Sequence, residues 1–242
     1  MTELVVEKAM AEGIAYARHH TLPLLLFETR TTDRELATGS IVQTPEGYAL
    51  VTAKHVIERL EEWGERGRMQ IGGEAFVIPT PPSAQIRKAR SLDVGMILMN
   101  DEFVLMSGWP VIEYESLSNR MVKKGDLTTY VGYPGATKSF SSAGNFLSPL
   151  AFAAMIETVE PDQFSMRCDP QRYETDMPVD QEMHHIGGIS GAPIFKIIEI
   201  DGGRLRRPLL VGWVHEGMAW SQLEQKHYAT PLLGVAAWFG IS

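Results

Sequence analysis

Short runs of apolar and β-branched residues recur along most of the chain, and Gly, Pro, Asp and Asn separate them. Runs of this kind between turn-forming residues are typical of β-strands. The clearest runs cover residues 22–27, 37–43, 48–52, 76–78, 94–99, 127–131, 163–167, 192–198 and 209–214. Many short strands with frequent turn signals predict an all-β protein built as a sandwich or a barrel.

A helical spacing of apolar residues is confined to a few segments. Residues 3–19 predict a helix at the start of the chain, and residues 56–63 and 234–239 are further helical candidates. The strand pattern restarts around residues 100–124, which indicates a boundary between two parts. Residues 137–182 show no clear pattern, and we expect a long loop or an insertion there.

Size and composition limit the function classes. The chain has 242 residues, enough for one large all-β domain or two small ones, and its net charge of −8 argues against nucleic-acid binding. Cys168 is the single cysteine, so no internal disulfide forms. The first residues lack the pattern of a secretory signal, and the apolar run at 22–27 is too short to span a bilayer. We expect a cytoplasmic protein that binds neither nucleic acid nor membranes; a mature secreted form whose leader has been removed is the alternative.

Three residues with acyl-transfer chemistry occur in the order His55, Asp93, Ser190, each in a suitable local context. His55 follows Thr-Ala-Lys, Asp93 precedes an apolar strand-like run, and Ser190 lies in a Gly-Ile-Ser-Gly segment. A serine hydroxyl needs a base to become a nucleophile, and histidine titrates near neutral pH. A carboxylate fixes the tautomer of that histidine, and nearby glycine lets backbone N–H groups converge on an oxyanion. The pattern predicts a Ser-His-Asp triad.

These segments resemble those of trypsin-like serine peptidases, which have the chymotrypsin fold. Residues 51–56 resemble the family's Thr-Ala-Ala-His segment, and residues 92–98 resemble its segment of Asp followed by an apolar strand. Residues 188–193 resemble its Gly-Asp-Ser-Gly-Gly-Pro. Residues 210–217 look like the strand that lines the primary specificity pocket, and residues 228–239 look like the closing strand and C-terminal helix.

The resemblance implies a fold of two six-stranded antiparallel β-barrels of chymotrypsin type, with an N-terminal helix and a short C-terminal helix. The helical extension would cover residues 1–20, the first barrel residues 21–110 and the second barrel residues 111–242. The active site would lie in the cleft between the barrels.

The resemblance also implies the site. His55 and Asp93 would come from the first barrel and Ser190 from the second, with Ser190 as nucleophile, His55 as base and Asp93 as its orienting partner. The backbone N–H groups of Gly188 and Ser190 would form the oxyanion hole.

The specificity pocket would contain His184, His215 and Gly217. Two imidazoles there would favour an acidic residue at the cleaved position (P1), as in bacterial glutamyl endopeptidases. A polar pocket wall without charge preference is the alternative.

Two departures from the family pattern stand beside the nucleophile. Ile189 replaces the Asp that pairs with a new N-terminus after zymogen cleavage in secreted digestive members. We therefore predict no such activation and a bacterial, non-zymogen type of enzyme. Ala192 replaces the second Gly, and its small methyl group is expected to be tolerated.

The expected reaction is hydrolysis of peptide bonds in a protein or peptide substrate, with no metal and no cofactor. The adjacent His pairs at 19–20 and 184–185 do not suit one metal ion, because neighbouring side chains on a strand point to opposite sides. Because a free cytoplasmic peptidase is hazardous, we expect a regulatory protein partner or a gate. The N-terminal helix and residues 137–182, which the family does not match, are the places to look.

Two alternative functions stay open. The first is a catalytically silent peptide-binding or regulatory module on the same fold. The second is an α/β-hydrolase esterase, in which Asp201 or Glu216 and His227 would complete a triad in a different chain order.

Overall fold

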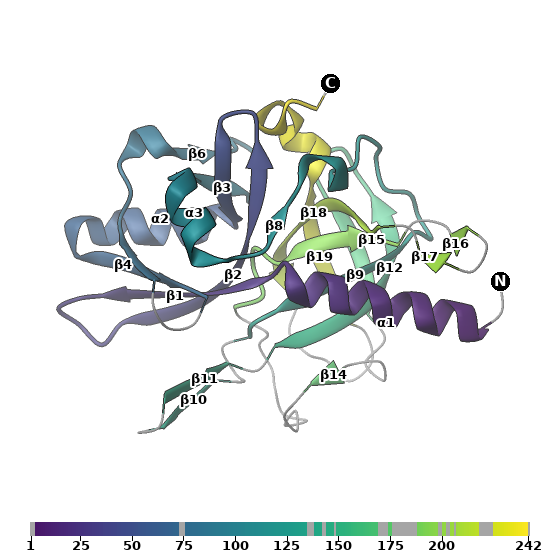
Figure 1. Cartoon of the computed structure of the whole chain (residues 1–242), viewed down its shortest axis with the longest axis horizontal. Helices are drawn as coiled ribbons and strands as arrows, with labels where there is room; N and C mark the ends of the chain where they lie inside the picture. The colour runs from purple at the N-terminus through teal and green to yellow at the C-terminus, as the bar shows by residue number, and fades with distance from the viewer. Residues whose placement is uncertain are drawn as a thin grey trace.

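The computed structural model describes residues 3–72, 76–134, 138–141, 144–147, 149–168, 174–175, 188–197, 200–201, 204–205, 207–217 and 225–241. Two large β-sheets lie side by side, one from each half of the chain, with α1 (Glu3–His19) against the C-terminal half (Figure 1). The predicted all-β architecture with few helices is confirmed.

After α1, the described residues of the N-terminal half form one sheet and two further α-helices. The strands run in the order β5-β4-β1-β2-β3-β7-β6, and β8 joins the sheet by pairing with β2. The elements are β1 (Leu22–Glu28), β2 (Arg34–Thr44), β3 (Gly47–Thr52), α2 (Lys54–Trp63), η1 (Gly64–Arg66), β4 (Gly67–Ile71), β5 (Phe76–Pro79), η2 (Ser83–Gln85), β6 (Ile86–Lys88), β7 (Gly95–Met99), α3 (Asp101–Ser107), β8 (Val111–Ile112) and η3 (Tyr114–Ser116).

The prediction of a closed six-stranded barrel is wrong for this half. Among the described residues no pairing joins β5 to β6, so the sheet is an open half-barrel. β5 ends at Pro79, and Pro81 and Pro82 follow it, so this part of the edge lacks N–H donors. α2 contacts both β4 and β7, the strands next to the two edge strands β5 and β6.

The C-terminal half contains a closed barrel of six antiparallel strands, as predicted. Their order is β13-β19-β18-β15-β9-β12, and pairing of β12 with β13 closes the ring. The strands are β9 (Leu127–Gly132), β12 (Leu150–Val159), β13 (Phe164–Cys168), β15 (Pro193–Lys196), β18 (Leu209–Gly217) and β19 (Gln225–Pro231). Short additional strands are β10 (Lys138–Ser141), β11 (Gly144–Leu147), β14 (Glu174–Thr175), β16 (Ile200–Asp201) and β17 (Arg204–Leu205).

Burial of large side chains in the interior favours closure of these strands into a barrel. Tyr130 of β9 pairs with Phe152 of β12 on one side and with Ile194 of β15 on the other. All three side chains are fully buried in one apolar cluster, because alternate positions along each strand face the same side. The two aromatic rings stack with centroids 4.8 Å apart. Burial of such rings is a large favourable contribution to folding.

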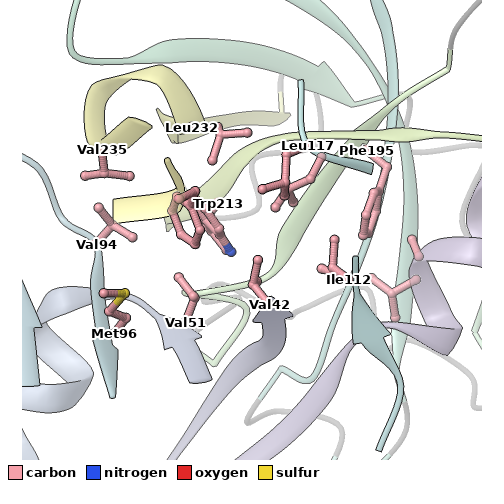
Figure 2. Packing of buried hydrophobic residues seen from close by; sticks show 14 of the residues in the cluster. Val42, Val51, Val94, Met96, Ile112, Leu117, Phe195, Trp213, Leu232 and Val235 are labelled. Atoms are coloured by element: carbon pink, nitrogen blue, oxygen red, sulfur yellow. The ribbon is translucent and has the colours of Figure 1, made fainter. Parts of the chain in front are cut away.

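A second apolar cluster joins the two halves. Figure 2 shows Trp213 of β18 among Val42 and Val51 of the first sheet and Leu232 and Val235 of the C-terminal segment. The Trp213 indole N–H also donates to the Ser40 hydroxyl at 3.4 Å. Because this cluster takes side chains from both sheets, the two halves share a core, and their relative placement is fixed by packing.

The two ends of the chain pack into the same shared cluster. Met10, Ile14 and Ala17 of α1 are buried there, and α1 contacts β9, β12 and β15. The predicted N-terminal helix is thus confirmed, and it is an integral part of the core. The predicted C-terminal helix is a 3₁₀ segment, η6 (Leu232–Phe239), with a kink at Val235.

The predicted boundary between residues 110 and 111 stays a prediction; β8, which begins at Val111, pairs with β2 of the first sheet. No helix within the described ranges has the length and apolar character needed to cross a membrane. The expectation of a long loop or insertion at 137–182 is wrong for residues 150–168, which form β12 and β13 of the closed barrel and the turn between them. Residues 169–173 and 176–182 of this range lie outside the described residues.

The core of the closed barrel holds one polar cluster. The Tyr130 hydroxyl bonds Nδ1 of His227 and lies 2.9 Å from the sulfur of Cys168. Within the described part of the chain, His227 Nε2 is buried with no hydrogen-bond partner. Burial lowers the pKa of His227 to about 4 and raises the pKa of the Cys168 thiol to about 12, so both groups are neutral at pH 7.

His227 makes the barrel sensitive to acid. A histidine of unfolded chain titrates at its ordinary value of 6.5, whereas folded His227 titrates at about 4. The unfolded state therefore binds more protons below pH 6.5, and stability is lost as the pH falls from 6.5 to 4, by up to about 3 kcal/mol. We expect H227Q to lose less stability over that range than wild type in chemical denaturation at several pH values. Parallel losses in both proteins would contradict this assignment.

Candidate active site

His55 and Asp93 form a bidentate contact at the start of α2. The Asp93 carboxylate accepts the backbone N–H of His55 at 3.0 Å through Oδ1, and its Oδ2 lies 2.7 Å from His55 Nδ1. Ala53 precedes α2 and offers no side-chain cap, so Asp93 supplies the acceptor that the first turn of a helix needs. The same carboxylate therefore fixes both the backbone and the ring of His55.

This contact determines the chemistry of the imidazole. With Nδ1–H donating to Asp93, Nε2 of neutral His55 is left unprotonated and can accept a proton. The hydrogen bond that His55 donates to Asp93 raises the pKa of His55, although burial partly opposes it. Burial raises the pKa of Asp93, but the bonds and charge of His55 outweigh that effect, and the net pKa is lowered. Asp93 is therefore charged at neutral pH, as an orienting carboxylate must be.

Ser190 lies in a tight turn that only glycine can form. Gly188 and Gly191 have φ values of +104° and +90°, which side-chain-bearing residues rarely adopt. A Cβ on Gly191 would lie 2.0 Å from the Thr38 carbonyl oxygen and 2.4 Å from the Thr52 hydroxyl. The turn therefore needs glycine at position 191 both for its conformation and for its close approach to the first sheet.

Thr38 of β2 holds this turn against the first sheet. Its N–H donates to the Ser190 carbonyl at 3.0 Å, and its hydroxyl donates to the Gly188 carbonyl at 2.7 Å. The Thr52 hydroxyl in turn donates to the Thr38 carbonyl at 2.7 Å. Since Thr52 lies three residues before His55, this chain of bonds ties the serine turn to the segment that carries the imidazole.

Apolar burial anchors the other side of the turn. Ile189 is fully buried in the barrel cluster with Ile194 and Val214. An apolar side chain thus fills the position next to the serine, and Ala192 is buried in the same cluster. The turn is therefore held by packing on one side and by the Thr38 hydrogen bonds on the other.

The backbone N–H groups predicted to form an oxyanion hole are those of Gly188 and Ser190. Within the described residues, the N–H groups of Gly188 and Ser190 donate no hydrogen bond, whereas those of Gly191 and Ala192 donate to Val214 and Ile189. The Ser190 hydroxyl donates to the His215 carbonyl at 3.3 Å, and no hydrogen bond joins Ser190 to His55 among the described residues. A serine hydroxyl moves between staggered positions by rotation about one bond, so this contact describes a resting rotamer.

The predicted pocket residues have different outcomes. His215 lines a cavity of about 290 Å³ together with Asp93, Glu160 and Asp162. Gly217 is the last residue of β18, and His184 lies outside the described residues. The cavity is therefore lined by acidic side chains as well as by the basic His215.

The sequence did not single out Thr38 or Thr52 as functional. Both are fully buried, and both hydroxyls donate to backbone carbonyls near the site. Threonine is common in strands, so only the tertiary contact reveals its role. No group of His, Cys, Asp and Glu suited to a metal ion occurs among the described residues.

No protein-family model matches the chain, and no curated protein matches it significantly. The fold is similar to a serine endoprotease from Yersinia pestis, with a TM-score of 0.50 and 15% identity over 94% of this chain and 64% of that one. The Rv3671c protease from M. tuberculosis, active form, gives a TM-score of 0.47 and 16% identity over 100% of this chain and 88% of that one. Catalytically active tobacco etch virus protease complexed with product gives a TM-score of 0.48 and 12% identity over 90% of this chain and 75% of that one. The Yersinia enzyme shows that this chain has the fold of a protease.

The contact between Gly191 and Thr38 can be tested against a matched glycine. Gly125 has nearly the same φ, +88°, but a Cβ there would meet nothing within 4 Å. G125A should cost only the conformational strain, about 1–2 kcal/mol, whereas G191A adds a steric overlap and should cost at least about 2 kcal/mol more. Chemical denaturation measures both. Equal losses of stability would mean that the serine turn does not press against Thr38.

Proposed function

We propose that this chain is a serine endopeptidase that cleaves protein or peptide substrates through an acyl-enzyme on Ser190. The observation that carries the proposal is the His55–Asp93 pair, which the Thr52–Thr38 bonds tie to the glycine turn of Ser190. The protease fold shared with the Yersinia enzyme is consistent with this function. The roles of the individual residues are proposals.

In the proposed reaction, the Ser190 hydroxyl rotates away from the His215 carbonyl and attacks the carbonyl carbon of the scissile bond. Its proton passes to Nε2 of His55, and Asp93 stabilises the imidazolium. The negatively charged oxygen that forms accepts hydrogen bonds from the backbone N–H groups of Gly188 and Ser190. His55 then gives the proton to the leaving amine as the C–N bond breaks, and water hydrolyses the resulting ester by the same route.

Buried Ile189 supports the finer proposal of a trypsin-like enzyme of the bacterial, non-zymogen type. Its apolar side chain cannot receive an ion pair from a newly formed N-terminus, and packing already holds it in place. Activation by cleavage of the chain is therefore not required. A cytoplasmic location and a regulatory protein partner remain predictions from the sequence.

A catalytically silent peptide-binding module is the second candidate. The observation that favours it is the Ser190 hydroxyl, which bonds the His215 carbonyl and not His55. The esterase alternative is ruled out, because the named strand pairings in the described residues are antiparallel except β2–β8, and a strand, not a helix, follows Ser190. His227, which that alternative requires, is fully buried in the barrel core.

A fluorophosphonate probe separates the two candidates. Wild-type protein should be labelled on Ser190, with the proton of the hydroxyl passing to His55 and fluoride leaving, and S190A should not be labelled. Peptide turnover should fall about 10⁶-fold in S190A. S91A removes an exposed serine near Asp93 and should label like wild type. Folded wild-type protein that takes up no label would favour the silent module.

The finer expectation of an acidic P1 residue needs its own test. It depends on His184 and His215, while Glu160 and Asp162 in the cavity of His215 oppose it. We therefore expect faster cleavage after Glu or Asp than after Arg or Phe, by about tenfold or less, which corresponds to 1.4 kcal/mol or less. A peptide library with varied P1 residues measures the ratio, and faster cleavage after Arg would overturn the expectation.

A further inference from the structure

His215 lies at an irregularity in the barrel wall. On the two neighbouring strands Val214 pairs with Ala229 and Glu216 pairs with Tyr228, so His215 is the extra residue of a β-bulge. A bulge interrupts the ladder and redirects a side chain, and bulges often occur beside active sites. The backbone and the ring of His215 are therefore available for contacts outside the sheet.

Ser190 contacts His215, and Asp93 lines a cavity together with it. The His215 carbonyl accepts the Ser190 hydroxyl at 3.3 Å, and its ring Nδ1 lies 3.2 Å from the Thr230 hydroxyl. The His215 side chain and Asp93 line the same cavity of about 290 Å³. Asp93 therefore bonds the His55 imidazole directly and shares this cavity with His215.

Charge on His215 reaches Asp93. Burial raises the pKa of Asp93, the contacts with His55 lower it, and the charge of His215 also lowers it. Asp93 thus stabilises protonated His55, and the same carboxylate would interact with a charged His215. When two titrating groups share a partner, their proton equilibria are coupled.

We propose that His215 is a positioning residue of the triad. Its protonated ring partly neutralises the negative charge of Asp93, so that protonated His55 is less stabilised and is easier to deprotonate. The inference rests on the proposed peptidase function and deepens it. A peptidase of this kind keeps its base neutral, and so active, at lower pH than Asp93 alone would allow. The effect acts through Asp93, so His215 itself need not touch the substrate.

Three acidic residues line the same cavity as His215. Asp93 comes from the segment between β6 and β7, and Glu160 and Asp162 come from the turn between β12 and β13. β19 contributes Thr230, which carries no charge. The surroundings of His215 are therefore acidic, and negative charge favours the protonated form of an imidazole.

Direct titration of His55 tests the coupling without requiring enzyme activity. The full chain, with ¹⁵N-labelled histidine, is titrated by NMR as wild type, H215Q and H19Q, where His19 is an exposed histidine of α1. We expect the midpoint of His55 to rise in H215Q by about 0.3–1 pH unit and to stay unchanged in H19Q. The pH at which fluorophosphonate labelling reaches half its maximum should rise by a similar amount.

The outcomes separate this inference from the peptidase proposal. An unchanged His55 midpoint in folded H215Q overturns the inference, because a purely structural role for His215 would lower stability without moving that midpoint. If H215Q does not fold, H215S removes the same charge with a smaller side chain and is titrated in its place. Absence of labelling in wild type, together with a raised midpoint in H215Q, would refute the peptidase and leave the coupling through Asp93 supported.

Discussion

Hydrogen bonds from Thr38 connect the two halves of the molecule at the candidate site. Its N–H and hydroxyl hold the carbonyls of Ser190 and Gly188, and its own carbonyl accepts the Thr52 hydroxyl. Because both threonines are fully buried, loss of the bond between them would leave the Thr52 hydroxyl without water or partner, at a cost of about 1–3 kcal/mol. The bonds thus set the position of the serine turn relative to His55.

Packing makes this arrangement rigid. The shared cluster around Trp213 draws on both sheets and on α1, so the half-barrel and the closed barrel cannot move apart without exposing apolar surface. Asp93 accepts two hydrogen bonds in this arrangement, one from the backbone N–H of His55 in the first turn of α2 and one from the ring of His55. The same contacts that stabilise the fold therefore also orient the groups proposed for catalysis.

The sequence predicted the parts that depend on local pattern. Strand runs and turn residues indicated the all-β architecture, and the contexts of His55 and Asp93 predicted a pair that the structure brings into contact. The open first sheet was missed because pairing between its edge strands β5 and β6 is a tertiary property, and the local pattern of each strand does not encode it. The roles of Thr38 and of the bulge at His215 depend on strand register across long sequence separations, and no local pattern encodes them.

The most direct test of the central claim is a crystal structure of the protein after reaction with diisopropyl fluorophosphate. We predict phosphorus bonded to Ser190 Oγ and a phosphoryl oxygen within about 3 Å of the N–H groups of Gly188 and Ser190. The Thr38 hydroxyl should still donate to the Gly188 carbonyl, and His55 Nε2 should face the adduct. A serine turn detached from Thr38, or an adduct beyond the reach of His55, would contradict the account.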